Sequence, residues 1–204
     1  MNEVYWGSVS DDYKELLARV DAWYRTVQES HPADVPCSKG CRDCCIGLFD
    51  VSLADRALLR EGLAQADPAV RRDIQGRAAA LVEQLRLIRP DLGDTLDGMS
   101  PEEIDELCDL AGETECPVLG PEGECRLYAH RPLTCRMSGV PVVDLSGKAV
   151  FPEGCGRCTL KPQDTPRLDC GGLSKRERKI LKARFPGRSG VTLFIAQALD
   201  PSAE

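Results

Sequence analysis

Four cysteines lie close together in the segment CSKGCRDCCIG. They are Cys37, Cys41, Cys44 and Cys45. A second segment, GCGRC, carries Cys155 and Cys158 and repeats the two-residue spacing that separates Cys41 from Cys44. Two thiolates at this spacing can bind one metal ion, because a tight turn brings both sulfurs to the same side. The two pairs together predict a metal site.

The number of cysteines raises the question of disulfides. The chain has 11 cysteines in 204 residues. Its first residues, MNEVYWGSVSDDYKELL, lack the basic and then apolar order of a secretory signal. No stretch has the apolar length that a membrane span needs. We therefore expect a cytoplasmic protein without membrane association, where thiols stay reduced and disulfides are rare. Metal binding then explains the cysteines better than disulfide bonding does.

Nine of the cysteines are candidate metal ligands. They are Cys37, Cys41, Cys44, Cys45, Cys116, Cys125, Cys135, Cys155 and Cys158. Cys108 falls inside an expected helix and is expected to be a buried structural thiol, and Cys170 is also left out. Adjacent side chains usually diverge, so Cys44 and Cys45 suit two metal sites, a polynuclear cluster, or one ligand beside one free thiol. Nine thiols exceed one four-thiolate site, so we expect either two sites or one cluster with spare thiols.

The charge of the chain argues against one class of partner. With 33 acidic and 26 basic residues, the formal net charge is −7. A general nucleic-acid binder needs a basic face to neutralise phosphates, so no nucleic-acid partner is expected. The basic segment SKRERKILKARFPGR is interpreted as the solvated face of a helix. A protein partner or a protein substrate remains open, and the oligomeric state is not predicted.

Apolar residues at helical spacing predict a mainly α scaffold. The expected helices cover residues 10–30, 51–66, 68–90, 100–112 and roughly 175–185. Ser10 and Ser100 are expected caps, and Ser52 with Asp55 resembles a capping box. The segment VTLFIAQAL fits a helix or a strand.

The segment ECPVLGPEGECRLYAHRPLTCRMSG is different, because it is rich in proline and glycine and is expected to be a loop. It supplies Cys116, Cys125 and Cys135. The next segment, VPVVDLSGKAVFP, predicts a β-hairpin with Ser146 and Gly147 near its turn. We expect a helical scaffold that holds a loop-rich cysteine site beside one small hairpin.

These elements are expected to form a single domain over residues 1–204. The helix at residues 10–30 comes first, the cysteine core covers about 35–160, and residues 171–204 form a C-terminal extension. This length is enough to bury a conventional core.

A longer motif makes the chain similar to a known family. Its parts are Cys116-Pro117-Val118-Leu119, the turn Pro121-Glu122-Gly123-Glu124 before Cys125, then Tyr128, Arg131-Pro132 and Cys135-Arg136. With the Cys-Cys doublet, this order resembles the cysteine-cluster proteins that carry a CxxCxxCC motif and are described as zinc- or iron-chelating. The resemblance covers roughly residues 35–160. It departs from the motif in the first cysteine segment, residues 37–45, which we call the first knot. There, three residues rather than two separate Cys37 from Cys41.

The resemblance implies a metal–thiolate centre, either an iron–sulfur cluster, [4Fe–4S] in its expected form, or Zn(II). One branch of the family is similar to flagellin lysine-N-methylase, which implies protein lysine methylation as an alternative activity. Arg131 and Arg136 bracket Cys135. Guanidinium groups can donate hydrogen bonds to thiolate sulfur and offset cluster charge, so both arginines are candidate cofactor-binding residues. Ordinary ion pairs at the surface are the alternative.

Two function classes stay open, and whether the protein is an enzyme is not decided. The first is a metal-binding protein whose centre is structural or serves electron transfer, metal handling or sensing. The second is an iron–sulfur-dependent protein lysine methyltransferase. The sequence has two histidines, with no glycine-rich nucleotide loop and no general-base constellation, which favours the first class.

The spacing of Cys37, Cys41 and Cys44 matches the CxxxCxxC pattern of radical enzymes. Those enzymes use a barrel of alternating strands and helices, and this chain is too short and too helical for one. Soft thiolates bind zinc and iron–sulfur clusters alike. The surplus of thiols beyond four favours an iron–sulfur centre over zinc alone.

Overall fold

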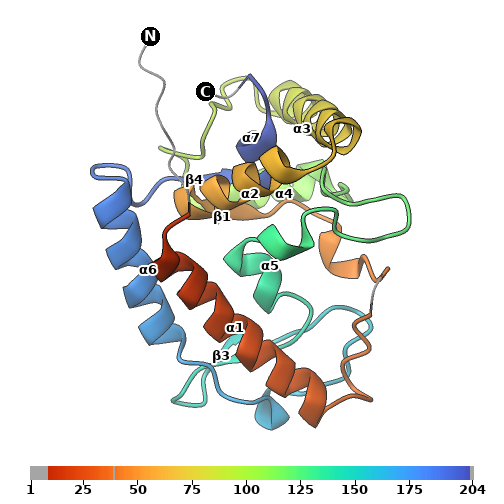
Figure 1. Ribbon diagram of the computed structural model, residues 1–204, viewed down its shortest axis with the longest axis vertical. Coiled ribbons are helices and arrows are strands. Elements are labelled where there is room, and N and C mark those ends of the chain that lie inside the picture. The colour runs from red at the N-terminus through yellow and green to blue at the C-terminus, as the bar shows by residue number, and fades with distance from the viewer. Residues whose placement is uncertain (1–8, 39, 203–204) are drawn as a thin grey trace. The chain divides into compact units, whose positions relative to one another are not determined.

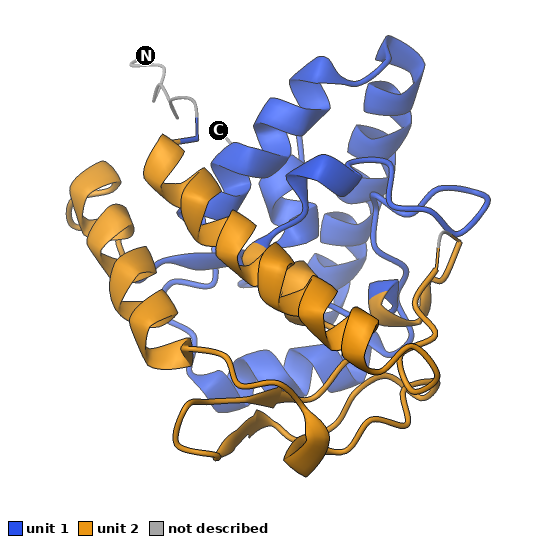
Figure 2. Ribbon diagram, turned by 60° about the horizontal axis from the view of Figure 1, so that its bottom comes forward, with its two compact units in different colours: residues 1–9, 45–132, 190–204 blue, residues 10–44, 133–189 orange. Residues whose placement is uncertain are grey.

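The computed structural model describes residues 9–38 and 40–202. These residues are mainly α-helical, with two small antiparallel sheets of two strands each, which confirms the predicted fold class. They divide into two compact units, coloured separately in Figure 2. Unit 1 contains Val9, Cys45–Pro132 and the segment that begins at Gly190, and unit 2 contains Ser10–Cys44 and Leu133–Ser189. The single domain expected from the sequence stays a prediction.

Unit 2 is built on helix α1, Asp11–Ser30. Ser10 caps this helix as predicted, because its hydroxyl oxygen accepts a hydrogen bond from the backbone N–H of Tyr13 at 3.3 Å. Helices α5, Leu133–Met137, and α6, Cys170–Arg184, both pack against α1 (Figure 1). The buried face of α1 carries Tyr13, Leu16, Leu17, Val20, Trp23 and Val27.

Unit 2 also holds the predicted hairpin. Strand β2, Val142–Val143, pairs antiparallel with β3, Ala149–Phe151. The carboxylate of Asp144 accepts hydrogen bonds from the backbone N–H groups of Ser146 at 2.8 Å and Lys148 at 3.0 Å. Gly147 has φ +95°, a left-handed conformation that glycine adopts without a Cβ clash. A 3-10 turn, η3, follows at Pro162–Asp164.

Unit 1 contains α2, Leu53–Gln65, α3, Pro68–Ile88, and α4, Pro101–Ala111. The short helix α7, Ile195–Leu199, packs against α2 and α3. Its core includes Leu81, Val82, Leu85, Leu92, Leu96, Leu107, Phe194 and Ala196. Burial of each large apolar side chain stabilises the fold by roughly 1.5–3 kcal/mol.

A small sheet ties the C-terminal part of the chain into unit 1. Strand β1, Asp50–Ser52, pairs antiparallel with β4, Thr192–Phe194. The ambiguous segment VTLFIAQAL is therefore a strand followed by a helix. The residues expected as a C-terminal extension pack within the units, because α6 contacts α1 and α7 contacts α3.

The local signals predicted most helix ends correctly. Ser52 with Asp55 and Ser100 with Glu103 form reciprocal capping boxes. Helix α6 begins at Cys170, earlier than the expected start near residue 175, because the Asp169 carboxylate accepts a hydrogen bond from the Gly172 N–H at 2.9 Å and caps the helix there. Helix α5 was not expected, since it lies in a segment interpreted as a loop.

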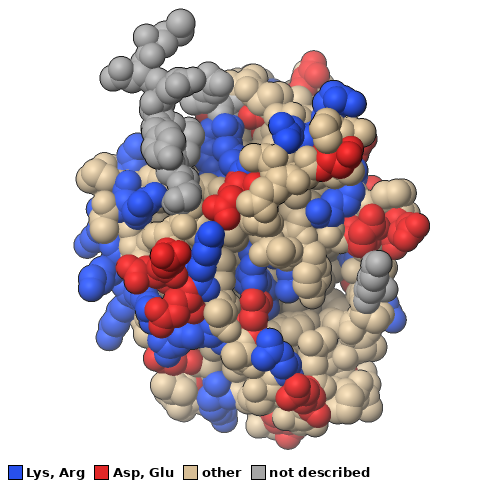
Figure 3. Space-filling view, in the orientation of Figure 1, with Lys and Arg blue, Asp and Glu red and all other residues tan. Residues whose placement is uncertain are grey.

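The basic segment forms α6, and blue side chains gather over this helix in Figure 3. Lys175, Arg178, Lys179 and Lys182 are exposed, whereas Arg176 forms an ion pair with Glu15 of α1 at 2.7 Å. Throughout residues 9–38 and 40–202, every helix is too short or too polar to cross a membrane.

Candidate metal centre

Three candidate ligands lie in unit 1, and backbone pairing brings them together. Cys45 ends the 3-10 turn η1, Asp43–Cys45. Its carbonyl oxygen accepts a hydrogen bond from the N–H of Cys116 at 2.9 Å. Cys125 forms an isolated β-bridge with Leu119, on the loop that begins at Cys116. We call Cys45, Cys116 and Cys125 the unit 1 thiols.

The loop that begins at Cys116 directs a backbone N–H group toward the Cys116 sulfur. The backbone N–H of Val118 donates to the Cys116 thiol, which lowers the pKa of that thiol. Burial acts in the opposite direction and more strongly, and the neighbouring thiols of Cys45 and Cys125 add to it. The result is that the pKa of Cys116 rises to about 12, so this thiol is protonated at neutral pH unless a metal replaces its proton.

Cys125 has the same arrangement. Burial raises its pKa, while the backbone N–H of Leu127 donates to its sulfur and lowers the pKa. The positive charges of Arg131 and Arg126 also favour the thiolate. The guanidinium carbon of Arg131 lies 3.9 Å from the centre of the Tyr128 ring.

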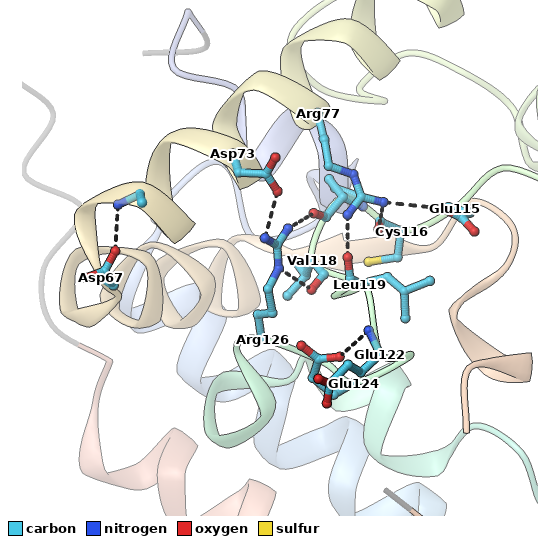
Figure 4. Close-up of polar contacts among 12 residues, drawn as sticks. Asp67, Asp73, Arg77, Glu115, Cys116, Val118, Leu119, Glu122, Glu124 and Arg126 are labelled. Carbon is cyan, nitrogen blue, oxygen red and sulfur yellow. Dashed lines mark hydrogen bonds and ion pairs between the residues drawn. The ribbon is translucent and has the colours of Figure 1, made fainter. Parts of the chain in front are cut away.

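Arg77 of α3 fixes the loop that follows Cys116 (Figure 4). Its guanidinium donates to the carbonyl oxygens of Leu119 and, at 3.3 Å, Cys116. It also pairs with the carboxylate of Glu115 at 3.5 Å. These bonds hold the loop carbonyls on the side of α3.

Arg126 holds the same loop from a second position (Figure 4). It donates to the carbonyl oxygens of Val118 at 3.4 Å and Pro117 at 3.3 Å. Its side chain is mostly buried and forms an ion pair with Asp73 of α3 at 2.7 Å. Val118 thus accepts a hydrogen bond from Arg126 through its carbonyl oxygen and donates one to the Cys116 sulfur through its N–H.

Unit 2 contains the other six candidate ligands. Five of them, all except Cys135, belong to the first cysteine segment and the GCGRC segment. They are Cys37, Cys41, Cys44, Cys155 and Cys158, which we call the unit 2 thiols. The N–H of Cys155 donates to the carbonyl oxygen of Gly139 at 3.2 Å. Gly139 has φ +94°, and a Cβ placed on it would lie 3.7 Å from the sulfur of Cys44 and 3.9 Å from that of Cys37. The sulfurs of Cys44 and Cys37 therefore both lie beside Gly139, and the positive φ rather than lack of space favours glycine there.

Side chains, and one amide, donate to these sulfurs. The hydroxyl of Tyr24 donates to Cys37 at 3.1 Å, and the guanidinium of Arg157 donates to Cys41 at 3.5 Å. Burial raises the pKa of Cys37, and the Tyr24 hydrogen bond opposes that rise. Burial also raises the pKa of Cys158, against the effect of the Leu160 N–H that donates to its sulfur.

The other predicted site residues are Cys135, Arg131 and Arg136. Cys135 lies on α5, in unit 2. Arg136, on the same helix, is 7% exposed and pairs with Asp21 of α1. The metal-binding role expected for Cys135 and the cofactor-binding role expected for Arg131 and Arg136 stay predictions. Cys108 is half-buried rather than fully buried and packs against the unit 1 core, and its structural role stays a prediction.

The donor set fits a soft metal. Cysteine thiolates are the ligands preferred by zinc and by iron–sulfur clusters. In residues 9–38 and 40–202, no three Cys, His, Asp or Glu side chains are positioned closely enough to hold a metal ion. The thiols are therefore neighbours that must converge further when a metal binds.

Four hydrogen-bond donors near the thiols were not identified from the sequence: Tyr24, Arg77, Arg126 and Arg157. Arg126 directly follows Cys125. Tyr24 and Arg77 lie on helices far from any cysteine motif, so no local pattern identifies them. Arg157 stands between Cys155 and Cys158, and its position in the GCGRC segment was the available signal.

Comparison with protein families gives one match. The model of the CxxCxxCC family, described as "Putative zinc- or iron-chelating domain", matches residues 36–156. This range includes all of the unit 1 thiols and every unit 2 thiol except Cys158. No curated protein and no solved structure matches the chain.

Proposed function

The chain belongs to the CxxCxxCC family of zinc- or iron-chelating domains, and from this premise we propose that it holds an iron–sulfur or zinc centre through cysteine thiolates. The observation that carries the proposal is the set of hydrogen-bond donors directed at sulfur. Backbone N–H groups donate to Cys116, Cys125 and Cys158, each from the residue two positions later.

These donors favour the charged form of sulfur. A hydrogen bond to a thiolate stabilises it more than it stabilises a neutral thiol. In the metal-free chain, burial outweighs the donors and keeps the thiols protonated. A bound cation removes that penalty, because it compensates the thiolate charge directly. The donors therefore suit a metal-bound thiolate better than they suit a free thiol.

Iron–sulfur is the metal centre we favour, because the chain offers more thiols than one zinc ion takes. Bound zinc would supply a structural crosslink, and a bound iron–sulfur cluster would supply one-electron redox chemistry. Electron transfer, metal handling and sensing are the roles that such a centre supports. The lysine methyltransferase alternative comes from the family resemblance, and we found no feature among the described residues that favours it.

Anaerobic purification followed by metal analysis and absorbance spectroscopy tests the proposal. We expect bound iron with acid-labile sulfide and a sulfur-to-iron charge-transfer band. Stoichiometric zinc without iron would support metal binding but overturn the choice of cluster. A chain that binds neither metal after anaerobic reconstitution would contradict the whole proposal.

Two substitutions provide the matched pair for that experiment. Cys125→Ser should lower the metal content, because Cys125 lies among clustered thiols. Cys108→Ser should reduce stability with unchanged metal content, because Cys108 packs on the apolar core of the same unit. Loss of metal in the Cys108 variant alone would show that the ligand assignment is wrong.

A further inference from the structure

We infer that the cysteines form two separate metal centres and that the peptide bond between Cys44 and Cys45 divides their ligands. The unit 1 centre takes Cys45, Cys116 and Cys125. The unit 2 centre takes its ligands from Cys37, Cys41, Cys44, Cys155 and Cys158. This inference rests on the proposed metal-binding function and specifies its ligands.

The unit 1 thiols are linked to one another within their own unit. The Cys116 N–H to Cys45 carbonyl bond, at 2.9 Å, is flanked by a β-bridge between Ile46 and Glu115. The thiols of Cys45 and Cys125 both lie near enough to Cys116 for their charges to act on it. Cys45 is thus tied to the loop at Cys116.

The unit 2 thiols form their own group. The thiols of Cys155 and Cys41 act on the charge of Cys37, and those of Cys155 and Cys37 act on Cys158. Cys44 joins the group through Gly139, since the sulfurs of Cys44 and Cys37 both lie within 4 Å of a Cβ placed on that glycine.

The conformation of the doublet explains how neighbours in sequence separate. Cys44 and Cys45 are the last two residues of the 3-10 turn η1. Successive side chains of a 3-10 helix point about 120° apart, because it has 3.0 residues per turn. Cys44 also departs from helical geometry, with φ −87° and ψ 15°. Both sulfurs therefore cannot easily face one mononuclear ion.

Each group has its own positive charges. Arg77, Arg126 and Arg131 act on the unit 1 thiols, and Arg157 acts on the unit 2 thiols. Zinc bound by three thiolates carries a net charge of −1, and by four thiolates −2, so a nearby guanidinium offsets charge at either centre. Two separate metal–thiolate centres each need positive charge nearby, and each group of thiols has it.

Zinc titration of the reduced, metal-free, full-length chain tests the inference whatever the native metal is. We expect two equivalents in the unsubstituted chain. Cys125→Ser, which leaves two unit 1 thiols, should lose one equivalent. A variant that combines Cys41→Ser, Cys155→Ser and Cys158→Ser, which leaves two unit 2 thiols, should lose the other equivalent. The chain with all four substitutions should bind none. Cobalt(II), whose thiolate charge-transfer bands report sulfur ligation, should give the same counts.

Several outcomes would overturn the inference. They are one equivalent in the unsubstituted chain, or loss of both equivalents when only one unit is substituted and the circular dichroism stays native. If a variant does not fold, Cys116→Ser replaces Cys125→Ser in unit 1, and the combination of Cys37→Ser, Cys44→Ser and Cys155→Ser replaces the unit 2 variant. Cys108→Ser and Cys170→Ser, one in each unit, should retain two equivalents. A chain that binds no zinc or cobalt at all would instead contradict the proposed function itself.

Discussion

The unit 1 thiols and the unit 2 thiols are held in different ways. In unit 1, backbone hydrogen bonds connect the cysteine segments, and Arg77 and Arg126 fix the carbonyls between them. In unit 2, two of the sulfurs accept hydrogen bonds from side chains, those of Tyr24 and Arg157. Backbone hydrogen bonds within a braced loop persist without metal, whereas single side-chain hydrogen bonds to sulfur give weaker restraint. The comparison predicts that the unit 1 loop keeps its conformation without metal, although its thiols must still converge, and that the unit 2 segments depend more on their metal.

Metal removal should show this difference most strongly. A ligand present at 1,000 times its dissociation constant stabilises a protein by about 4 kcal/mol, which corresponds to roughly 10 °C in Tm for a chain of this size. Chelation should lower Tm by at least that amount. Hydrogen exchange should then accelerate more at Cys155, Cys158 and Thr159 than at Cys116 and Arg126.

The reason is the support of each loop. All five amides donate to backbone carbonyl oxygens, but the unit 1 loop is also held to α3 by the side chains of Arg77 and Arg126. Equal acceleration in the two units would remove the distinction between a loop that keeps its conformation and segments that depend on their metal. An unchanged Tm after verified metal loss would show that the metal does not stabilise the fold.

Alkaline pH should destabilise the metal-free chain, because the buried Cys116 thiol then loses its proton. The metal-loaded chain should not show this effect. The folded pKa of Cys116, about 12, lies above the ordinary thiol value of 9.0. Its contribution to stability is therefore complete below about pH 9 and is lost as pH rises toward 12, by about 1.4 kcal/mol for each pH unit. In the metal-loaded chain the thiol proton is already gone.

Urea unfolding of reduced protein at pH 8 and pH 10.5, with and without metal, measures this effect. Tyrosine and lysine also titrate in this range, so Cys116→Ser serves as the reference. In the metal-free chain, the slope of unfolding free energy against pH should be smaller for this variant by the equivalent of about one bound proton. An identical pH dependence in both proteins would contradict the raised pKa.

Arg77→Ala should weaken the unit 1 site. The change leaves the Leu119 and Cys116 carbonyls without this donor, at a cost of about 1–3 kcal/mol in unfolding free energy. Loss of such a supporting contact typically weakens metal affinity about 10–100-fold. Competition with a chelator of known affinity measures the change at the unit 1 site.

Arg71→Ala is the matched control. Arg71 also lies on α3 and donates to backbone carbonyls, those of Leu63 at 3.1 Å and Ala64 at 2.7 Å, on the neighbouring helix. It should reduce stability similarly and leave metal affinity unchanged. Equal weakening of metal binding in both variants would show that Arg77 acts through general stability rather than by positioning the loop.

Tyr24→Phe should have the smallest effect. It removes the hydroxyl that donates to Cys37 and should cost about 0.5–1.5 kcal/mol. The Cys37 pKa should rise further, so its alkylation in the metal-free chain should need a higher pH. Mass spectrometry resolves alkylation at each cysteine, and Tyr128→Phe, at a residue 64% exposed in unit 1, is the control. A Cys37 profile that is equal in the two variants would show that the hydrogen bond has no effect.

The sequence predicted the features that depend on neighbouring residues. The caps at Ser10, Ser52 and Ser100 each involve a hydrogen bond within three residues, so the local pattern contains both partners. The hairpin around Gly147 is local for the same reason. The β1–β4 pairing was not predicted, because Asp50 and Phe194 meet only after the chain has folded.

The same distinction applies to the candidate site. Residue type and spacing identified the cysteines as candidate ligands, because soft-metal chemistry is carried by the thiols themselves. The grouping of Cys45 with Cys116, and of Cys44 with the space beside Gly139, depends on contacts between distant segments. Spacing alone therefore left two alternatives open, two metal sites or one cluster with spare thiols.

The order of the segments along the chain has a consequence for biosynthesis. Unit 2 begins at Ser10, is interrupted after Cys44 by unit 1, and resumes at Leu133. Translation adds about 5–20 residues per second, so the thiols of the first knot wait on the order of ten seconds before Cys155 leaves the ribosome. During that interval they are unprotected nucleophiles in a nascent polypeptide. Prompt capture of metal, or a chaperone that shields the knot, would then determine how much of the newly made protein escapes oxidation.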